Sequence, residues 1–196
     1  MPAPPPRFHS RIRVNVSELS YSPFSRVAEL SDFSCGVGDL DDFIHTGEVQ
    51  EYAASGYGQT TLVWRDKQVV AYYTVGLGEL SAEKLKVGIK TFHTKRFFIE
   101  ENVPTVKLRA LAVDRRVQGK GIGRILVAKI AHDATENPQT PPIMVTRATP
   151  QSIDFYRKCG FVPVSERPKK VASGSLTLFF RLDVLGTPDI RVDVPV

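Results

Sequence analysis

The stretch LAVDRRVQGKGIGRILVAKI, residues 111–130, constrains the fold more than any other part of this chain. An apolar strand-like run leads into a turn with three glycines, and an apolar helical run follows directly. The start of a helix leaves backbone N–H groups without partners and carries partial positive charge, so it attracts phosphate. Glycines let a ligand approach the backbone closely. We therefore predict a strand, turn and helix that bind a pyrophosphate, surrounded by Arg115, Arg116, Lys120 and Arg124.

Two other phosphate-binding motifs do not fit this turn. A P-loop needs GxxxxGK followed by Ser or Thr, which the chain lacks. The dinucleotide fingerprint GxGxxG would need glycine where Arg124 stands, and no acidic residue ends a suitable next strand. A turn that merely joins a strand to a helix would not need four nearby cations.

Charge is segregated along the chain, whose formal net charge is +5. Residues 28–54 carry seven acids and no Lys or Arg, whereas residues 84–124 carry eleven Lys or Arg and three acids. This pattern indicates a polyanionic ligand near the basic block. The alternative is two solvated surfaces of opposite sign.

The composition argues against several other classes of protein. No apolar run approaches the roughly 18 residues of a membrane span, and the proline-rich start lacks the apolar region of a secretory signal. Cys35 and Cys159 have no metal-binding spacing, so we expect buried thiols in a reducing cytoplasm. Neither these cysteines nor His45, His93 and His132 suggest a metal site, and His132 is expected on the outer face of its helix.

The hydrophobic pattern predicts a mixed α/β sheet with helices on both faces. Two strands are expected around a tight turn at Asp66–Lys67, and residues 81–104 are assigned to helix and loop. Further helices are expected at 38–45, from 47 to near 56, and at 123–136, and further strands at 105–113, 142–148 and 173–182. We expect one domain over 21–185, between a flexible arm at 1–20 and a tail at 186–196.

A short helix is expected in TPQSIDFYRKCGF, residues 149–161. Thr149 is the predicted N-cap, and Pro150 suits the first helical position. Gly160 is placed for the left-handed residue that follows the last turn, with Phe161 folding back.

The sequence resembles the GNAT family of N-acetyltransferases. Gln118 to Gly123 reads QGKGIG, which has the family's acetyl-coenzyme A pattern Q/R-x-x-G-x-G/A. LAVD precedes it, and FYRKCGF at 155–161 is similar to a second family pattern, FYxxxGF. The order of expected elements matches that fold over residues 26–183. The resemblance implies a mostly antiparallel mixed sheet that splays at the acetyl-CoA site.

A narrower resemblance concerns one subgroup of that family. FSCGVGDLDDFI, followed by the hairpin VVAYYTV, is similar to acetyltransferases that include toxins of toxin–antitoxin pairs. The resemblance implies acetylation of the amino group of aminoacyl-tRNA and a ribbon–helix–helix antitoxin as partner. A homodimer is also implied, since dimers are common in this family.

The resemblance also implies roles for individual residues. Tyr156 would protonate the leaving thiolate, although a tyrosine packed in the core with a bonded hydroxyl is the alternative. Glu79 is a candidate general base, although an exposed loop carboxylate is the commoner fate of such a residue. A main-chain N–H near Val113 could stabilise the oxyanion. The expected acetyl-CoA contacts, with no metal ion, are Leu111, Ala112, Val113, Arg115, Gln118, Gly119, Lys120, Gly121, Ile122, Gly123, Arg124, Ser152, Phe155 and Tyr156.

The sequence departs from the subgroup's pattern in three places. Arg109 stands one position before the arginine of L-x-R-L-A-V, and one step along a strand reverses the face of a side chain. Thr149 and Ser152 replace the Asn and small residue that precede the second pattern. The connection at 137–142 is short and rich in proline, which would narrow the acceptor cleft.

The predicted function is acetyl-CoA-dependent N-acetylation of a primary amine, with charged tRNA as one acceptor. A small-molecule, peptide or protein amine is the alternative acceptor. A non-catalytic acyl-CoA-binding module on the same fold is the alternative from a different class.

Overall fold

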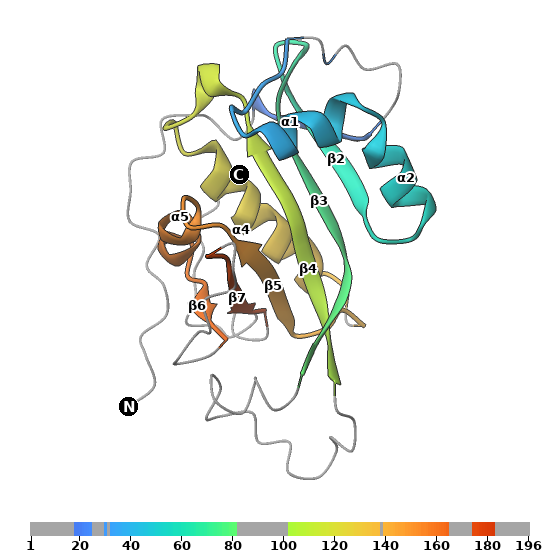
Figure 1. The fold of residues 1–196 in the computed structure, drawn as a ribbon, viewed down its shortest axis with the longest axis vertical. Helices are drawn as coiled ribbons and strands as arrows, with labels where there is room; N and C mark the ends of the chain where they lie inside the picture. Colours follow the sequence, from blue (N-terminus) through green and yellow to red (C-terminus); the bar gives the residue numbers. More distant parts are fainter. Residues whose placement is uncertain are drawn as a thin grey trace. The chain divides into compact units, whose positions relative to one another are not determined.

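The computed structural model describes residues 18–24, 30, 32–81, 102–137, 139–164 and 174–182 (Figure 1). Seven strands form a mostly antiparallel sheet in the order β1-β2-β3-β4-β5-β7-β6. The elements, in chain order, are β1 Ser20–Pro23, α1 Gly38–His45, α2 Glu48–Ala54, β2 Gln59–Arg65, β3 Gln68–Ser81, β4 Asn102–Val113, the 3₁₀ turn η2 Arg115–Val117, α4 Ile122–Thr135, β5 Ile143–Ala148, α5 Ile153–Lys158, β6 Val162–Pro163 and β7 Leu176–Arg181.

Most expected elements are confirmed, and three differ. The strand β1 begins at Ser20, which the sequence assigned to the flexible arm. The short strand β6 was not expected, because two residues give no recognisable period. The segment expected as helix and loop at 81–104 contributes its ends to strands β3 and β4, and residues 82–101 lie outside the described residues. Most of the predicted arm and tail also lie outside them.

The hairpin of β2 and β3 turns at Asp66 and Lys67, as predicted. Both residues have positive φ, 49° and 65°, which the two-residue turn of a twisted hairpin requires. A β-bulge interrupts the register between Val63 and Trp64.

Backbone contacts divide the chain into two compact units, cut within β3 after Gly76, within β4 after Lys107 and within α4 after Ile130. We call them the α1 unit and the α5 unit. The α1 unit holds β1, α1, α2, β2, η2, most of β3, the end of β4 and the start of α4. The α5 unit holds the remaining parts of β3, β4 and α4, with β5, α5, β6 and β7. The single domain predicted from the sequence stays a prediction.

In the α1 unit, α1 and α2 cover one face of the β2–β3 hairpin (Figure 1). The helix α1 forms because Leu40, Phe43 and Ile44 recur at helical spacing, and it packs there against Tyr72. The Tyr72 hydroxyl donates a 2.6 Å hydrogen bond to the Leu40 carbonyl. The buried cluster on this face is Phe33, Cys35, Ile44, Val49, Leu62, Val69, Tyr72 and Ala112.

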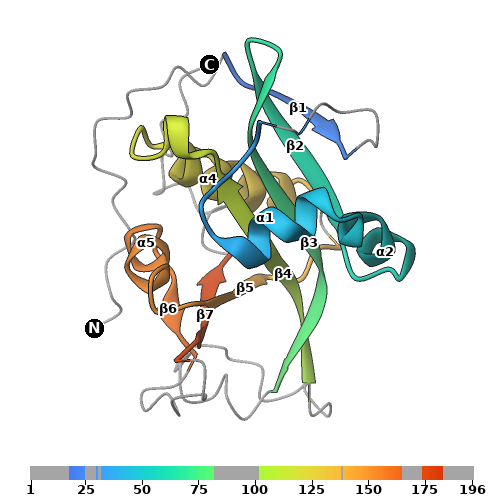
Figure 2. The same cartoon turned by 45° about the horizontal axis from the view of Figure 1, so that its top comes forward.

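The helix α4 lies against the opposite face of this hairpin (Figure 2). Lys129 places its ammonium 4.8 Å from the ring centroid of Tyr21, which stands opposite Val63 in the sheet register. Val63 and its neighbour Leu62 point to opposite faces, and Leu62 belongs to the cluster under α1. The predicted stripe of α4 is buried: Ile122, Ile125, Leu126 and Ile130. Helices therefore cover both faces of the sheet in this unit, as predicted.

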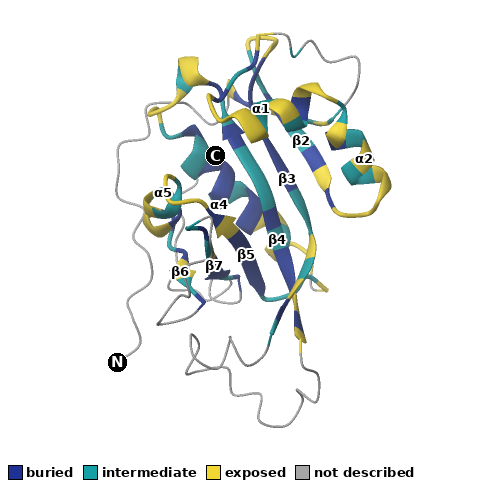
Figure 3. Cartoon of the chain, viewed as in Figure 1, coloured by how far each residue is buried: buried dark blue, intermediate teal, exposed yellow. Residues whose placement is uncertain are grey.

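In the α5 unit, β7 pairs antiparallel with both β5 and β6. The β5–β7 register runs from Ile143 opposite Arg181 to Ala148 opposite Leu176. Figure 3 shows buried residues along these strands. The apolar side chains of this unit's cluster are Leu80, Val103, Ile143, Val145, Val164 and Phe179.

Candidate functional site

The turn between β4 and α4 takes the form that the glycines predict. Gly119 and Gly121 have φ values of 75° and 94°, which favour glycine at both positions. The N–H groups of Arg124 and Ile125 donate to the Gly121 carbonyl, so the helical bonding begins there. The amides of the first turn precede this bonding and have no acceptor within the helix. Most of residues 115–120 are exposed (Figure 3).

Asp114, at the start of this turn, is 2% exposed and organises the backbone around it. Its carboxylate accepts the backbone N–H of Arg116 at 2.8 Å and caps the 3₁₀ turn. The guanidinium of Arg116 donates from Nε and Nη2 to the two carboxylate oxygens, at 2.8 and 2.9 Å. Burial alone would raise the pKa of Asp114, but the bonds from Arg116 and Ser34 lower it below its usual value.

The pairing with Asp114 changes the expected charge around the turn. Arg116 counts among the four cations predicted there, but its guanidinium is engaged with a buried carboxylate. Lys120 is exposed and places its ammonium 3.4 Å from the Arg116 carbonyl. Arg115 is exposed too. The charge facing solvent is therefore smaller than the sequence alone predicts.

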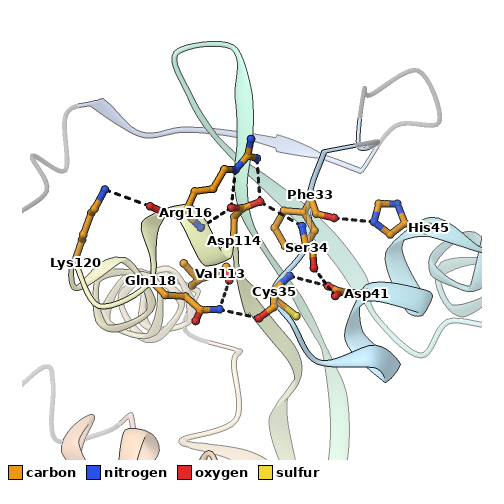
Figure 4. A network of polar contacts seen from close by, with 10 residues as sticks. All are labelled: Phe33, Ser34, Cys35, Asp41, His45, Val113, Asp114, Arg116, Gln118 and Lys120. Carbon is orange, nitrogen blue, oxygen red and sulfur yellow. Dashed lines mark hydrogen bonds and ion pairs between the residues drawn. The ribbon is translucent and has the colours of Figure 1, made fainter.

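Residues 33–36, which are distant in the sequence, lie against this turn (Figure 4). The Ser34 N–H donates to Asp114 Oδ2 at 3.2 Å, and the Arg115 N–H donates to the Ser34 carbonyl at 2.9 Å. Gly36 has a φ of 83°, and a Cβ there would come within 3.0 Å of the Arg115 side chain. The segment therefore needs glycine at 36 for both its backbone and its packing.

Asp41, in the first turn of α1, holds the same segment from its other side (Figure 4). Its carboxylate accepts the Ser34 hydroxyl at 2.8 Å, the Cys35 N–H at 2.7 Å and the Gly36 N–H at 3.2 Å. Burial opposes ionisation, but these hydrogen bonds hold the pKa of Asp41 below its usual value. The pattern FSCGVGDLD thus encodes a carboxylate and the amides that it binds.

Gln118 completes the connection between the segment and the turn. Its side-chain Nε2 donates to the carbonyls of Cys35 and Val113, each at 2.8 Å, and its backbone N–H donates to the Asp114 carbonyl. The sequence predicted Gln118 as a ligand contact, and the structure shows that its amide nitrogen bridges two protein carbonyls. The residue therefore shapes the turn from within.

The predicted contacts on β4 differ in exposure. Ala112 is buried in the cluster under α1, whereas Leu111 and Val113 are half-buried. The Val113 carbonyl is occupied by Gln118. Only main-chain groups of this strand were expected to contact the ligand, so the burial of Ala112 is compatible with that role.

Tyr156 lies in the α5 unit, on α5, and is 7% exposed. Its ring packs edge-on against Phe155 and Phe161, with centroid distances of 5.0 and 5.4 Å. Burial raises the pKa of Tyr156 to about 12, although a hydrogen bond with the buried Thr146 side chain acts in the opposite direction. The hydroxyl therefore keeps its proton at neutral pH.

The pattern FYRKCGF orients Tyr156 through the end of the helix. Gly160 has a φ of 90°, and its N–H donates to the Arg157 carbonyl at 3.0 Å. The Phe161 N–H donates to the Tyr156 carbonyl at 3.0 Å, and the two rings meet. This is a Schellman motif with its apolar contact, and it confirms the predicted left-handed glycine.

The start of α5 corrects the predicted N-cap. The helix begins at Ile153 with Ser152 as its N-cap, and no side chain bonds to the free amides there. Thr149 instead closes a preceding turn, because its carbonyl accepts the N–H groups of Ser152 and Ile153. Pro150 lies in that turn rather than in the helix. Ser152 therefore flanks the helix, while Phe155 is half-buried within it.

Several other candidates have clear positions. Glu79 is exposed and lies within β3, which continues to Ser81, rather than in the loop expected there. Both cysteines are buried, as predicted, and burial raises the pKa of Cys35 to about 11. His132 is exposed, as predicted, and His93 lies outside the described residues. Across the described ranges, no group of three His, Cys, Asp or Glu side chains could hold a metal ion.

Chemically, the turn at the start of α4 can bind an anionic phosphate, and Tyr156 can supply a proton. The sequence did not identify Asp41 and Asp114, the two carboxylates that hold the turn. Both lie inside the quoted patterns FSCGVGDLDDFI and LAVD, but the patterns alone do not show which backbone groups these carboxylates bind.

Among the described residues, no helix is long and apolar enough to cross a membrane.

This glycine turn and helix define a class of protein that a family model identifies independently. The model described as an acetyltransferase (GNAT) domain matches residues 36–178, and the chain belongs to that family. A tRNA-acetylating toxin of Mycobacterium tuberculosis (strain ATCC 25618 / H37Rv) is 28% identical over 110 residues, or 55% of this chain. The match spans 62% of that relative's length.

Solved structures with the same fold include complexes of the toxin AtaT. AtaT complexed with acetyl-methionyl-tRNAfMet is similar with a TM-score of 0.68 and 24% identity, over 85% of this chain and 96% of AtaT. A mutant of AtaT bound to the C-terminus of the antitoxin AtaR and acetyl-CoA is similar with a TM-score of 0.63 and 23% identity, over 85% and 95%. At these identities the likeness establishes the fold.

Proposed function

We propose that this chain transfers the acetyl group of acetyl-CoA to a primary amine by direct attack in a ternary complex. The acceptor that we propose is the amino group of an aminoacyl-tRNA. The observation that carries the proposal is the glycine turn before α4, where Gly119 and Gly121 adopt left-handed angles. The first amides of the helix that follows have no acceptor within that helix. Such a turn binds phosphate groups, and the diphosphate of acetyl-CoA is the one that we propose.

In this proposal the turn holds the pyrophosphate of acetyl-CoA. The amides from Gly119 to Gly123 would face the phosphate oxygens, and Arg115, Lys120 and Arg124 would add charge. Gln118 would act by positioning, since its side-chain amide holds the Cys35 and Val113 carbonyls. Main-chain groups of Leu111, Ala112 and Val113 would bind the acetyl carbonyl and the pantetheine chain.

The proposed reaction needs one nucleophile and one proton donor. The neutral amine nitrogen attacks the thioester carbonyl carbon, and the carbon–sulfur bond breaks as the tetrahedral intermediate collapses. The leaving thiolate takes the proton of Tyr156, and the amine nitrogen loses its extra proton to water or to Glu79. An α-amine with an unperturbed pKa of about 8 is already partly neutral, so it needs little help from a base. Phe155 and Ser152 would contact the pantetheine beside Tyr156.

Two observations favour aminoacyl-tRNA as the acceptor. The Mycobacterium tuberculosis relative is named a tRNA-acetylating toxin, and the AtaT structure is a complex with acetyl-methionyl-tRNAfMet. The chain is also basic, with a formal net charge of +5, and phosphate contacts dominate affinity for nucleic acids.

The proposal includes partners and location. A ribbon–helix–helix antitoxin is proposed because AtaT, which shares the fold, is found bound to the antitoxin AtaR. A homodimer and a cytoplasmic location are proposed from the family resemblance and from the spacing of the two cysteines.

The test is transfer of radiolabelled acetyl from acetyl-CoA to a panel of acceptors: aminoacyl-tRNA, deacylated tRNA, free amino acids and a short peptide. We expect label on aminoacyl-tRNA that mild base releases as an N-acetyl amino acid, and none on deacylated tRNA. A higher kcat/KM with free amines or the peptide would identify a different acceptor. Acetyl-CoA binding without coenzyme release from any acceptor would identify a binding module.

A further inference from the structure

Three side chains of the α1 unit form a cluster that the proposed acetyl-CoA site does not use: Tyr52, Tyr57 and Arg109. Tyr52 lies on α2, Tyr57 follows that helix, and Arg109 lies on β4. We call them the tyrosine–arginine cluster. We propose that it stacks an unpaired nucleobase at the 3′ end of an RNA acceptor, an inference that rests on the proposed function.

The end of α2 fixes the two tyrosine rings against each other. Gly56 has a φ of 71°, and its N–H donates to the Ala53 carbonyl at 3.0 Å. The Tyr57 N–H donates to the Tyr52 carbonyl at 3.1 Å, which completes a Schellman motif. The ring centroids of Tyr52 and Tyr57 lie 5.4 Å apart at an interplanar angle of 41°.

The backbone behind Tyr57 is held against β3 by two glycines. A Cβ on Gly76 would overlap the carbonyl oxygen of Tyr57, and a Cβ on Gly58 would lie 2.9 Å from the Val75 carbonyl oxygen. The chain therefore passes directly over the strand at this point. Tyr57 is 56% exposed, yet its backbone lies tightly against the sheet. Because this backbone is already fixed, ligand binding would cost little additional conformational entropy here.

Arg109 joins both rings to the sheet. Its Nη1 donates a 3.1 Å hydrogen bond to the Tyr52 hydroxyl. Its guanidinium carbon lies 5.5 Å from the Tyr52 centroid and 5.7 Å from the Tyr57 centroid, within the range of cation–π contacts. Phe43 supports Tyr52 edge-on from α1, at 5.6 Å. Arg109 therefore lies on the side of the strand that faces α2.

The chemistry of the cluster selects its ligand. Aromatic rings and guanidinium planes stack unpaired bases regardless of sequence, and a cation beside them attracts the linking phosphates. A capping contact alone needs only an apolar residue after Gly56, whereas here the residue is a tyrosine that is 56% exposed. Paired bases in a duplex offer no free face. Among the unpaired parts of a tRNA, the 3′ end is the one that carries the aminoacyl group of the proposed acceptor.

The test uses RNA without an amino acid, so that it is independent of acetyl transfer. The probe is an RNA hairpin with an unpaired 3′ end whose terminal base is 2-aminopurine, and its fluorescence is quenched when the base stacks. The control ligand is a hairpin without the overhang, tested as a competitor of the labelled probe. We expect the full-length protein to quench the fluorescence of the overhang probe, and we expect the blunt hairpin to displace that probe only weakly.

Three variants separate stacking from folding. Tyr57→Leu keeps the apolar contact of the cap but removes the aromatic ring, and we expect at least about tenfold weaker binding of the overhang. Tyr57→Phe should bind like the wild type. Val162→Ala, which trims an exposed apolar residue on β6, is the matched control and should change nothing.

The outcomes distinguish this inference from the proposed function. Unchanged quenching and affinity in Tyr57→Leu would overturn the stacking site, even if aminoacyl-tRNA is acetylated. Equal loss of affinity for the blunt hairpin would also overturn it, because it would mean general phosphate binding. Normal stacking without acetylation of aminoacyl-tRNA would support the site and reject the acceptor.

Discussion

Asp41 and Asp114 both accept hydrogen bonds from Ser34: the hydroxyl donates to Asp41 Oδ2 at 2.8 Å, and the backbone N–H donates to Asp114 Oδ2 at 3.2 Å. One carboxylate belongs to α1, and the other follows β4 and caps η2. The segment 33–36 also accepts a hydrogen bond from Gln118 through the Cys35 carbonyl. The glycine turn is therefore held by residues that are far apart in the sequence. The shape of the proposed pyrophosphate site depends on this network.

Replacing the buried carboxylate should loosen the turn. In Asp114→Asn, the charged bonds to Arg116 and Ser34 weaken, and we expect the free energy of unfolding to fall by about 2 kcal/mol. Affinity for acetyl-CoA should fall as well, measured by calorimetry. Asp39→Asn, an exposed acid in the first turn of α1, is the control and should change neither quantity by more than a few tenths of a kcal/mol. Equal behaviour of the two variants would refute this role of Asp114.

The two carboxylates should make stability depend on acid pH. Their pKa values are lower in the folded chain than the usual value of about 4 in an unfolded chain. Their contribution is therefore complete above about pH 4 and is lost as the pH falls through the folded pKa values. Urea unfolding at a series of pH values should show a smaller loss of stability below pH 4 in Asp41→Asn than in the wild type. The same slope in both proteins would contradict this assignment.

Gly119 has room for a side chain, but its left-handed backbone angle disfavours any residue other than glycine. A Cβ on Gly119 meets no heavy atom within 4 Å, yet its φ is 75°. We expect Gly119→Ala to cost about 1 kcal/mol of stability and to weaken acetyl-CoA binding. Gly38→Ala, also with open space but without a positive φ, should be neutral or slightly stabilising. Thermal unfolding with and without acetyl-CoA measures both effects.

Tyr156 should be needed for turnover and not for coenzyme binding. Tyr156→Phe keeps the ring contacts with Phe155 and Phe161 but loses the hydroxyl, so we expect about 1 kcal/mol lower stability from the lost bond to Thr146. The rate of acetyl transfer should fall by about a hundredfold or more, as for loss of a general acid. Stopped-flow or steady-state coenzyme release gives the rate. Turnover equal to the wild type would leave Tyr156 as a packing residue.

The thiols should be unreactive in the folded protein. Cys159 is fully buried, and burial raises the pKa of Cys35 to about 11, so little thiolate exists near neutral pH. A thiol-specific disulfide reagent should react with both groups only when the chain unfolds in urea. Fast reaction of either cysteine in buffer would show that its site opens in the native state.

Local signals in the sequence predicted much of the fold and part of the site. The hairpin turn at Asp66, the helix after Gly121 and the left-handed Gly160 follow from residues within a few positions of one another. The N-cap of α5 was placed too early, because the sequence does not show that Thr149 closes a separate turn before the helix.

The network around Ser34 could not be predicted in the same way. Its hydrogen bonds to Asp114 join residues 80 positions apart, and the contact of Arg109 with Tyr52 joins residues 57 apart. A single sequence contains no periodicity that pairs such distant residues. Acids are generally favourable at the start of a helix, so the acids of α1 gave no reason to assign a specific role to Asp41.

The bridge from Gln118 to the Cys35 carbonyl spans 83 positions and has a consequence for biosynthesis. A ribosome makes the FSCG segment well before Asp114 and Gln118, which bind it from the turn. During translation, the network that shapes the proposed coenzyme site can therefore form only after the strand β4 and the turn that follows it have emerged.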